Sequence, residues 1–183
     1  KTSIPCYEIN DLKNRLFFLI GKSTEKPTIK PISNCKIKST EKELESLLTT
    51  GKGSITLQGI FKVDNIHCKA VVKSWPPGKR FETILGKFEK ELLNQDIGFT
   101  DESSDDNKGT HIVFEVLKQR SRDEIFKSFV KKLSDVLTSN ISFEMIVVDH
   151  VTKNVKNMSV DEMLVETFKS YLKTNLIMLQ TNE

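Results

Sequence analysis

The stretch THIVFEVLKQRSRDEIFKSFVKKLSDVLTSNISFEMIVVD, residues 110–149, decides the fold because it contains a strand, a helix and a second strand in succession. Apolar and polar residues alternate through 110–118, the pattern of a half-buried strand. Ser121 and Glu124 have the spacing of a capping box that starts a helix. The run SFEMIVVD at 142–149 predicts a buried strand. Between them, helical spacing predicts one buried helix face: Ile125, Phe126, Phe129, Val130, Leu133 and Leu137.

The residues before this stretch extend the same pattern towards the N-terminus. Their periodicities predict, in chain order, a strand at 54–63, a strand at 65–74, a helix at 81–92 and a strand at 97–103. The first two strands meet at Asp64-Asn65, which predicts a hairpin turn.

The order of elements from residue 54 to residue 149 is β-β-α-β-β-α-β. Its last six members, β-α-β-β-α-β, have the ferredoxin-like order. We therefore predict an α+β fold with one mixed or antiparallel sheet and helices on one face. A strand pair separates the two helices, which disfavours a doubly wound parallel sheet.

Helices are also predicted on both sides of this core. A first helix begins near Asn10, which can cap it, and a second begins at the capping box of Thr40 and Glu43. Ser159 and Glu162 form another box, and the apolar stripe behind it meets no Gly or Pro, as in a helix that continues into a coiled coil. The predicted segments are a basic arm with helices at 1–53, an α+β core at 54–158 and the start of a coiled-coil helix at 159–183.

The net charge of +3 is unevenly distributed. Residues 1–53 contain ten Lys or Arg and six Asp or Glu, whereas residues 54–183 contain eighteen and nineteen. Within the first segment, KPTIKPISNCKIK at 26–38 has four lysines and no acidic residue. Such a stretch suits a polyanion, although modest charge runs are more often solvated surface.

The remaining composition narrows the class of protein. Cys6, Cys35 and Cys68 are an odd set without CxxC spacing, which fits a reducing compartment rather than a disulfide framework. No apolar run approaches the roughly 20 residues that span a bilayer, and no signal-peptide pattern is present. We therefore expect an intracellular protein without membrane contact. The chain begins at Lys1 rather than Met, which indicates a piece of a longer protein.

Residue types that carry chemistry are scattered. DESSDD at 101–106 offers four carboxylates without the spacing of an EF-hand loop, so we interpret it as an acidic hairpin tip. GKGS at 51–54 lacks the earlier glycine of a phosphate loop, although Lys52 between two glycines can present its ammonium to a phosphate. We predict no catalytic residue and no metal site in this chain. Metal ligands cluster, whereas three histidines lie far apart, the first two inside predicted strands: His67, His111 and His150.

Several motifs resemble segments of the type IIA DNA topoisomerases, the family that includes the tyrosine-bearing chains of gyrase and topoisomerase IV together with eukaryotic and viral topoisomerase II. KTSIPCYEINDLKN at 1–14 resembles the T-x-I-P segment that follows the family's catalytic-tyrosine domain. The resemblance covers essentially all 183 residues, although Lys73-Ser74-Trp75-Pro76 replaces the usual acidic-Leu-Pro form. Four further motifs follow in the family's order: TTGKGSITLQGIFKV at 49–63, AVVKSWPPGKRFETILGKFEKEL at 70–92, GFTDESSDDNKGTHIVFEV at 98–116 and MIVVDHVTKNVKNMSVDEMLVETFKSYL at 145–172.

The resemblance implies that the chain is the tower, or shoulder, domain, which binds gate DNA and leads into the coiled coil of the C-gate. Ile4 stands where the family's isoleucine inserts between base pairs and bends the DNA. Neither Tyr7 nor Tyr171 is then the nucleophile, because that tyrosine lies upstream. The chain alone is expected to be inactive, with the Mg²⁺ and ATP used by the parent bound elsewhere. Contacts to the DNA backbone are expected from Lys1, Thr2, Lys30, Lys36, Lys38 and Lys52.

The expected partners are double-stranded DNA and the remaining topoisomerase domains or subunits, in a homodimer or heterotetramer. Two other functions stay open: a stand-alone ferredoxin-like interaction domain that dimerises through its last helix, and an RNA-binding module. The latter needs exposed strand aromatics, whereas core positions suit the four that the strands carry: Phe61, Phe99, Phe114 and Phe143. Ile4 also has an alternative role, as an apolar staple that packs on the first helix.

Overall fold

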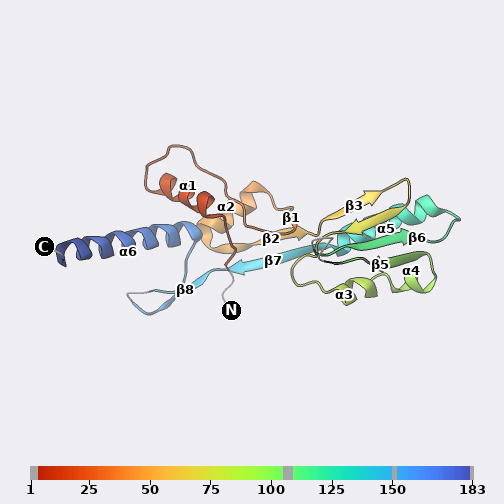
Figure 1. The fold of residues 1–183 in the computed structure, drawn as a ribbon. Coiled ribbons are helices and arrows are strands. Elements are labelled where there is room, and N and C mark those ends of the chain that lie inside the picture. The colour runs from red at the N-terminus through yellow and green to blue at the C-terminus, as the bar shows by residue number, and fades with distance from the viewer. Residues whose placement is uncertain (1–3, 105–108, 150–151, 182–183) are drawn as a thin grey trace. The chain divides into compact units, whose positions relative to one another are not determined.

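The computed structural model describes residues 4–104, 109–149 and 152–181. The described chain is α+β, as predicted, with six helices and antiparallel sheets (Figure 1). The helices are α1 (Ile9–Leu19), α2 (Glu41–Thr50), α3 (Phe81–Gly86), α4 (Glu89–Leu93), α5 (Arg122–Val136) and α6 (Val160–Thr181).

The strands form three sheets rather than the single sheet that the sequence predicts. The first has the order β1-β2-β7, the second β3-β4-β6-β5 and the third β8-β9. The strands are β1 (Lys36–Ile37), β2 (Lys52–Gln58), β3 (Phe61–Asp64), β4 (Lys69–Val72), β5 (Ile97–Asp101), β6 (Ile112–Val116), β7 (Thr138–Glu144), β8 (Ile146–Val148) and β9 (Val155–Asn157).

The chain divides into two compact units, and each is described by itself. Unit 1 comprises residues 1–32, 39–55 and 142–183, and unit 2 comprises residues 33–38 and 56–141. Unit 1 therefore combines residues from all three segments expected from the sequence, because its contacts bring the two ends of the chain together. It contains α1, α2 and α6, and α6 contacts both of the other helices.

Unit 2 is built on the sheet β3-β4-β6-β5, in which every neighbouring pair is antiparallel. Along the chain, the elements from β4 to β7 follow the predicted β-α-β-β-α-β order. A ferredoxin-like sheet would place the last of these strands beside the first. Here β3 pairs with β4 instead, from Phe61↔Val72 to Asp64↔Lys69, and β7 belongs to the sheet with β1 and β2.

The predicted strand at 54–63 is two strands because the chain leaves one sheet at Gly59. The Gly59 N–H donates to the Leu137 carbonyl at 2.9 Å, while the next residues join β4. A β-carbon on Gly59 would lie 2.5 Å from the Ser74 carbonyl oxygen and 3.2 Å from Pro76 Cδ. Only glycine fits this approach, so alternation alone could not reveal the break.

We expect Gly59→Ala to destabilise the protein by about 1–3 kcal/mol, because the new methyl group forces the Ser74 backbone to move. For a chain of this size, thermal melting should report a loss of roughly 2–4 °C per kcal/mol. Gly53→Ala, on the same strand β2, is the control, since its β-carbon would meet Leu47 Cδ1 at an ordinary 3.5 Å. Equal losses for the two variants would contradict the steric explanation.

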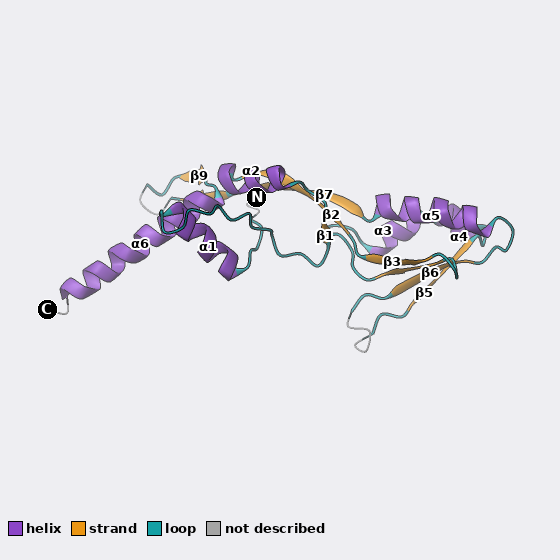
Figure 2. Cartoon of the chain, turned by 90° about the horizontal axis from the view of Figure 1, so that it is seen from above, coloured by secondary structure: helices purple, strands orange, loops and turns teal. Residues whose placement is uncertain are grey.

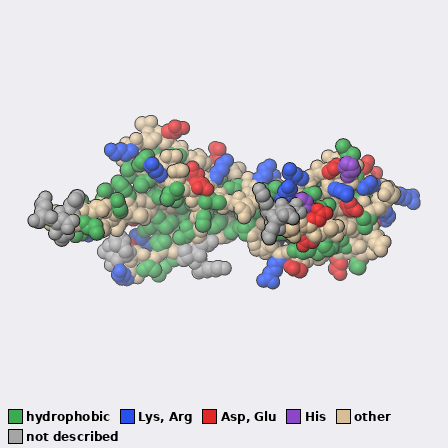
Figure 3. Space-filling view, viewed as in Figure 1, with side chains coloured by type: hydrophobic (Ala, Val, Ile, Leu, Met, Phe, Trp, Pro, Cys, Tyr) green, Lys and Arg blue, Asp and Glu red, His purple; other side chains and the backbone are tan. Residues whose placement is uncertain are grey.

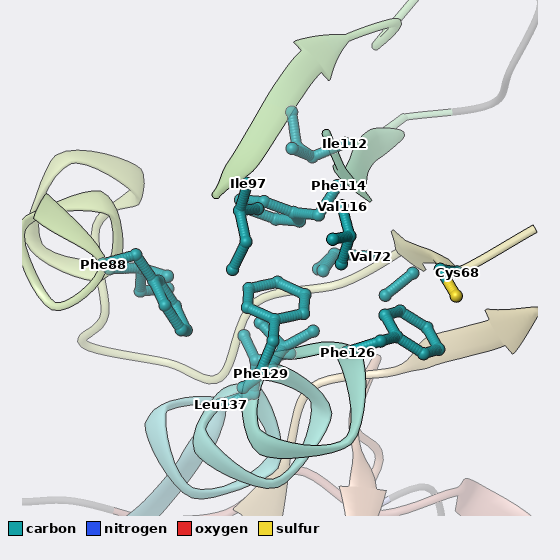
Figure 4. Close-up of a cluster of buried hydrophobic side chains, with 13 residues drawn as sticks. Cys68, Val72, Phe88, Ile97, Ile112, Phe114, Val116, Phe126, Phe129 and Leu137 are labelled. Carbon is teal, nitrogen blue, oxygen red and sulfur yellow. The ribbon is translucent and has the colours of Figure 1, made fainter. Parts of the chain in front are cut away.

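The core of unit 2 lies between its sheet and its helices. Figure 2 shows α3, α4 and α5 on the same side of β3, β5 and β6, as predicted. Phe126 and Phe129 of α5 point towards the strands that carry Phe114 and Val72 (Figure 4). The helix predicted at 81–92 is two short helices, and the fully buried Phe88 lies in the turn between them.

Four helices begin within one residue of the predicted positions, but only two of the four predicted caps are confirmed. Thr40 with Glu43 forms a complete capping box at α2, and Ser159 with Glu162 forms one at α6. Ser121 has φ +55°, outside the extended conformation that lets an N-cap side chain reach back, and it makes no cap hydrogen bond. Asn10 lies inside α1, which begins one residue earlier.

The hairpin of β3 and β4 is confirmed, but its turn is longer than predicted. Four residues, 65–68, connect Asp64 to Lys69, and the turn is closed by the Asp64 carboxylate, which accepts from the N–H groups of Ile66 and His67. His67 therefore lies in a turn rather than in a strand. Its ring Nδ1 is 2.7 Å from the second oxygen of Asp64.

Candidate functional site

The N-terminal segment of unit 1 presents Ile4 at the surface. Ile4 is 45% exposed, whereas the next residue, Pro5, is buried. Two backbone contacts hold this segment against Pro31 and Ile32. The Ile32 N–H donates to the Cys6 carbonyl at 2.8 Å, and Tyr7 forms an antiparallel bridge with Pro31. A buried proline thus anchors an exposed isoleucine, which is the arrangement that an apolar wedge requires.

An apolar groove of about 620 Å³ lies beside this segment. Figure 3 shows hydrophobic side chains gathered over the part of unit 1 that contains α1 and α6. Ile4 contributes to the groove, so the same side chain has both a solvent-exposed part and an apolar neighbour on each helix. Ile4 thus borders the groove, as a staple does, and keeps the exposed part that a wedge requires. The helix side chains that line the groove include Leu12, Leu16, Val160, Leu164 and Phe168.

The lysines of the basic stretch 26–38 are exposed. Lys30, in unit 1, precedes Pro31 and so lies next to the bridge that this proline forms with Tyr7. Lys36 and Lys38 belong to unit 2, where β1 pairs with β2 and the Lys38 N–H donates to the Thr56 carbonyl. Strand alternation puts these two lysines on the same side of the sheet. Among the described residues, no carboxylate forms an ion pair with any of the three.

Lys52 has a different environment. It follows Gly51, which ends α2 in the left-handed conformation, and its ammonium lies 3.0 Å from the Glu144 carboxylate. Both side chains are more than half exposed, so the ion pair is weak and a phosphate can compete for the ammonium. The two other residues expected at the DNA backbone, Lys1 and Thr2, lie outside the described residues.

The strongest polar centre of unit 1 is Arg15, which no motif in the sequence identified. Its side chain is completely buried, and all five guanidinium N–H groups have acceptors. Nε and Nη2 donate to the two carboxylate oxygens of Asp161 at 2.8 and 2.7 Å. Nη1 and Nη2 donate to Glu45 at 3.0 and 2.7 Å, and Nη1 also donates to the Pro27 carbonyl at 3.0 Å.

The charges around Arg15 change the proton affinities of its neighbours. Burial would raise the pKa of Glu45, but the hydrogen bonds and positive charges of Arg15 and Lys26 outweigh it and hold that pKa below its ordinary value. Burial, helped by the negative charge of Asp161, raises the pKa of the Tyr7 hydroxyl. This shift is opposite to the activation that a nucleophilic tyrosine needs.

The described residues include no group of three or more His, Cys, Asp or Glu side chains placed to hold a metal ion. Of the acidic run 101–106, Asp101 accepts the Ser103 N–H in a local turn, whereas Asp105 and Asp106 lie outside the described residues. His111 comes just before β6 and lies 3.7 Å from Glu102, and His150 is outside the described residues.

Over the described part of the chain, no helix is long and apolar enough to cross a bilayer. Comparison with protein-family models and with curated proteins finds no match. The function is therefore inferred from the chain's own residues: the order of its sequence motifs, the exposed Ile4 and the exposed lysines.

Proposed function

We propose that the chain is the tower domain of a type IIA DNA topoisomerase and helps to bind and bend the gate DNA. One observation carries the proposal. At the I-P position of the T-x-I-P motif, the isoleucine is half exposed while the proline is buried. An isoleucine needed only for packing would favour the opposite arrangement, because burial of its side chain contributes about 1.5–3 kcal/mol to stability.

In this function, Ile4 and the lysines have separate tasks. The apolar side chain of Ile4 enters between two base pairs and partly unstacks them, which costs a few kcal/mol and bends the duplex. The ammonium groups of Lys30, Lys36, Lys38 and Lys52 contact phosphates, which supplies affinity without sequence preference. The nucleophilic tyrosine, Mg²⁺ and ATP act in other parts of the parent protein.

The proposal predicts the salt dependence of DNA binding. Replacing Lys30, Lys36, Lys38 and Lys52 together by glutamine should make the plot of log Kd against log salt concentration shallower, by about 0.9 for each phosphate that is no longer neutralised. Fluorescence anisotropy with a labelled duplex between low and moderate salt measures this slope. Affinity should also fall similarly for unrelated duplex sequences, because phosphate contacts carry no sequence information.

The matched control changes the same amount of charge elsewhere. Lys87, Lys90, Lys127 and Lys131 are exposed lysines of unit 2 and can be replaced by glutamine together. In this control variant, the slope should stay close to that of the unsubstituted chain. If the unsubstituted chain and the first quadruple variant gave equal slopes, the four lysines would not contact DNA.

A second candidate function, protein interaction through α6, is favoured by one observation. The last half of this helix exposes apolar side chains, of which Tyr171 and Leu176 are at least 60% exposed. Such a stripe is typical of a helix that packs on a partner helix. Sedimentation of the chain over a range of concentrations tests it, since a stand-alone interaction domain should dimerise and lose the dimer when Leu172 and Leu176 are replaced by serine.

The RNA-binding alternative receives less support. Phe114 is completely buried, and Phe61 packs against the core of unit 2. Phe99 is 41% exposed, but its ring lies 5.6 Å from that of Phe81 between centroids in a T-shaped arrangement, and so already packs against an aromatic ring of the protein. Phe114 thus takes the predicted core position, whereas Phe99 lies at the surface of the sheet and Phe143 is half-buried.

A further inference from the structure

Arg15 is an unusual choice for the contact face of a helix. It is the one buried side chain of α1, and the apolar residues on the same face, Leu12, Leu16 and Leu19, are each partly exposed. A buried ion pair is weak evidence for stability, because an apolar side chain of similar size often serves as well or better. A guanidinium with five directed hydrogen bonds, in contrast, fixes one arrangement of its partners.

The partners of Arg15 come from three different elements. Glu45 lies on α2, Asp161 lies in the first turn of α6, and the Pro27 carbonyl belongs to the segment that follows α1. Both carboxylates are bidentate, so each fixes the orientation of the guanidinium as well as its distance. Arg15 therefore ties α1 and the segment after it to the two other helices of unit 1.

The residues tied in this way include the exposed Ile4. The Ile32–Cys6 hydrogen bond and the Tyr7–Pro31 bridge join the segment before α1 to the segment after it. Residues 4–32 therefore form one loop that contains α1 and is closed at its two ends. Residues of this closed segment and of α6 also line the apolar groove of about 620 Å³. Beside this groove, the directed bonds of Arg15 can hold Ile4 in one position on unit 1.

We propose that Arg15 is a positioning residue that holds residues 4–32 on α2 and α6 and thereby sets the place of Ile4. Loss of its bonds releases this segment while the core of unit 2 stays folded. The part of the proposal that concerns DNA rests on the proposed function. The part that concerns the segment does not, and it can be tested without DNA.

The test is amide hydrogen exchange, resolved by peptide, on the 183-residue chain. In Arg15→Met, exchange in α1 and at Ile32 should become roughly tenfold faster or more, because these amides then open locally, while β4 and β6 keep their protection. In Arg15→Lys, the exchange rates of these amides should lie between those of the unsubstituted chain and those of Arg15→Met, since an ammonium cannot satisfy two bidentate carboxylates. Arg122→Met is the control, because Arg122 donates to the His67 carbonyl within unit 2 and should leave α1 unchanged.

The result for Arg15 is decisive in either direction. Faster exchange confined to residues 4–32 and their contacts on α2 and α6 supports the positioning role. Unchanged exchange in both Arg15 variants overturns it, and so does equal loss of protection throughout the chain, which would make Arg15 an ordinary core residue.

A second measurement separates this proposal from the proposed function. The bend of a duplex on the parent protein should fall in Arg15→Met by a factor similar to that of Ile4→Ala, with smaller loss of affinity. Suppose that Arg15→Met releases the segment but the unsubstituted protein neither binds nor bends DNA. Arg15 would then remain a positioning residue, and only the DNA function would be overturned.

Discussion

Replacing Phe114 by alanine should lower the free energy of unfolding by about 3–5 kcal/mol, the largest loss of stability that we expect from a single substitution in unit 2. Phe114 is completely buried on β6, and its ring lies 5.4 Å from that of Phe129 and 6.2 Å from that of Phe88. Alanine removes the packing against both rings and leaves a cavity that the sheet and α5 can close only in part.

Urea denaturation followed by circular dichroism measures this loss. The control is Phe17→Ala on α1, where the ring is 40% exposed and lies beneath the Lys13 ammonium, so its loss should stay below roughly 1 kcal/mol. Comparable losses at the two positions would show that the ring cluster of Phe88, Phe114 and Phe129 is not the centre of the core.

On the proposed function, Ile4→Ala in the parent protein should reduce the ratio of bent to straight DNA about tenfold while changing affinity by less than about threefold, since the wedge would supply deformation and the lysines most of the affinity. A tenfold change in the ratio of bent to straight DNA corresponds to about 1.4 kcal/mol, which lies within the few kcal/mol that unstacking one base step involves. Energy transfer between dyes at the two ends of a short duplex measures the bend, and strand cleavage should fall with it.

The same variant distinguishes a wedge from a staple. Ile4 is 45% exposed, so its replacement should change the melting temperature little. Ile9→Ala is the control, because Ile9 is 78% exposed at the start of α1 and lies outside the I-P motif. If Ile4→Ala kept full bending but melted several degrees lower, Ile4 would be a packing residue of the groove.

Periodicity predicted most elements of this fold because each element buries one face. Periodicity did not predict the break at Gly59, since apolar and polar residues alternate on both sides of it within residues 54–63. The reason for the break is the backbone of Ser74, which approaches Gly59 only in the folded state. Periodicity also did not predict which sheet β7 joins. Strand patterns specify which face is buried but not which of two sheets a strand joins.

The candidate site was predictable to a different degree at each residue. Composition identified the lysines of the basic segment, but the ion pair of Lys52 with Glu144 joins residues far apart in sequence and needed the structure. Arg15 did carry a signal. It lies three residues after Leu12 and four before Leu19, on the apolar face of its helix, and a charged residue at such a position is buried only when it has partners.

The bond between Arg15 and Asp161 spans 146 residues of chain, and this separation sets an order of events during synthesis. Every residue of unit 2 is made before Asp161, because that unit ends at residue 141. A nascent chain can therefore complete the phenylalanine core while the guanidinium of Arg15 is still hydrated. The segments that carry Arg15 and Asp161 can therefore meet after unit 2 is complete, and full burial of the guanidinium waits for its second carboxylate.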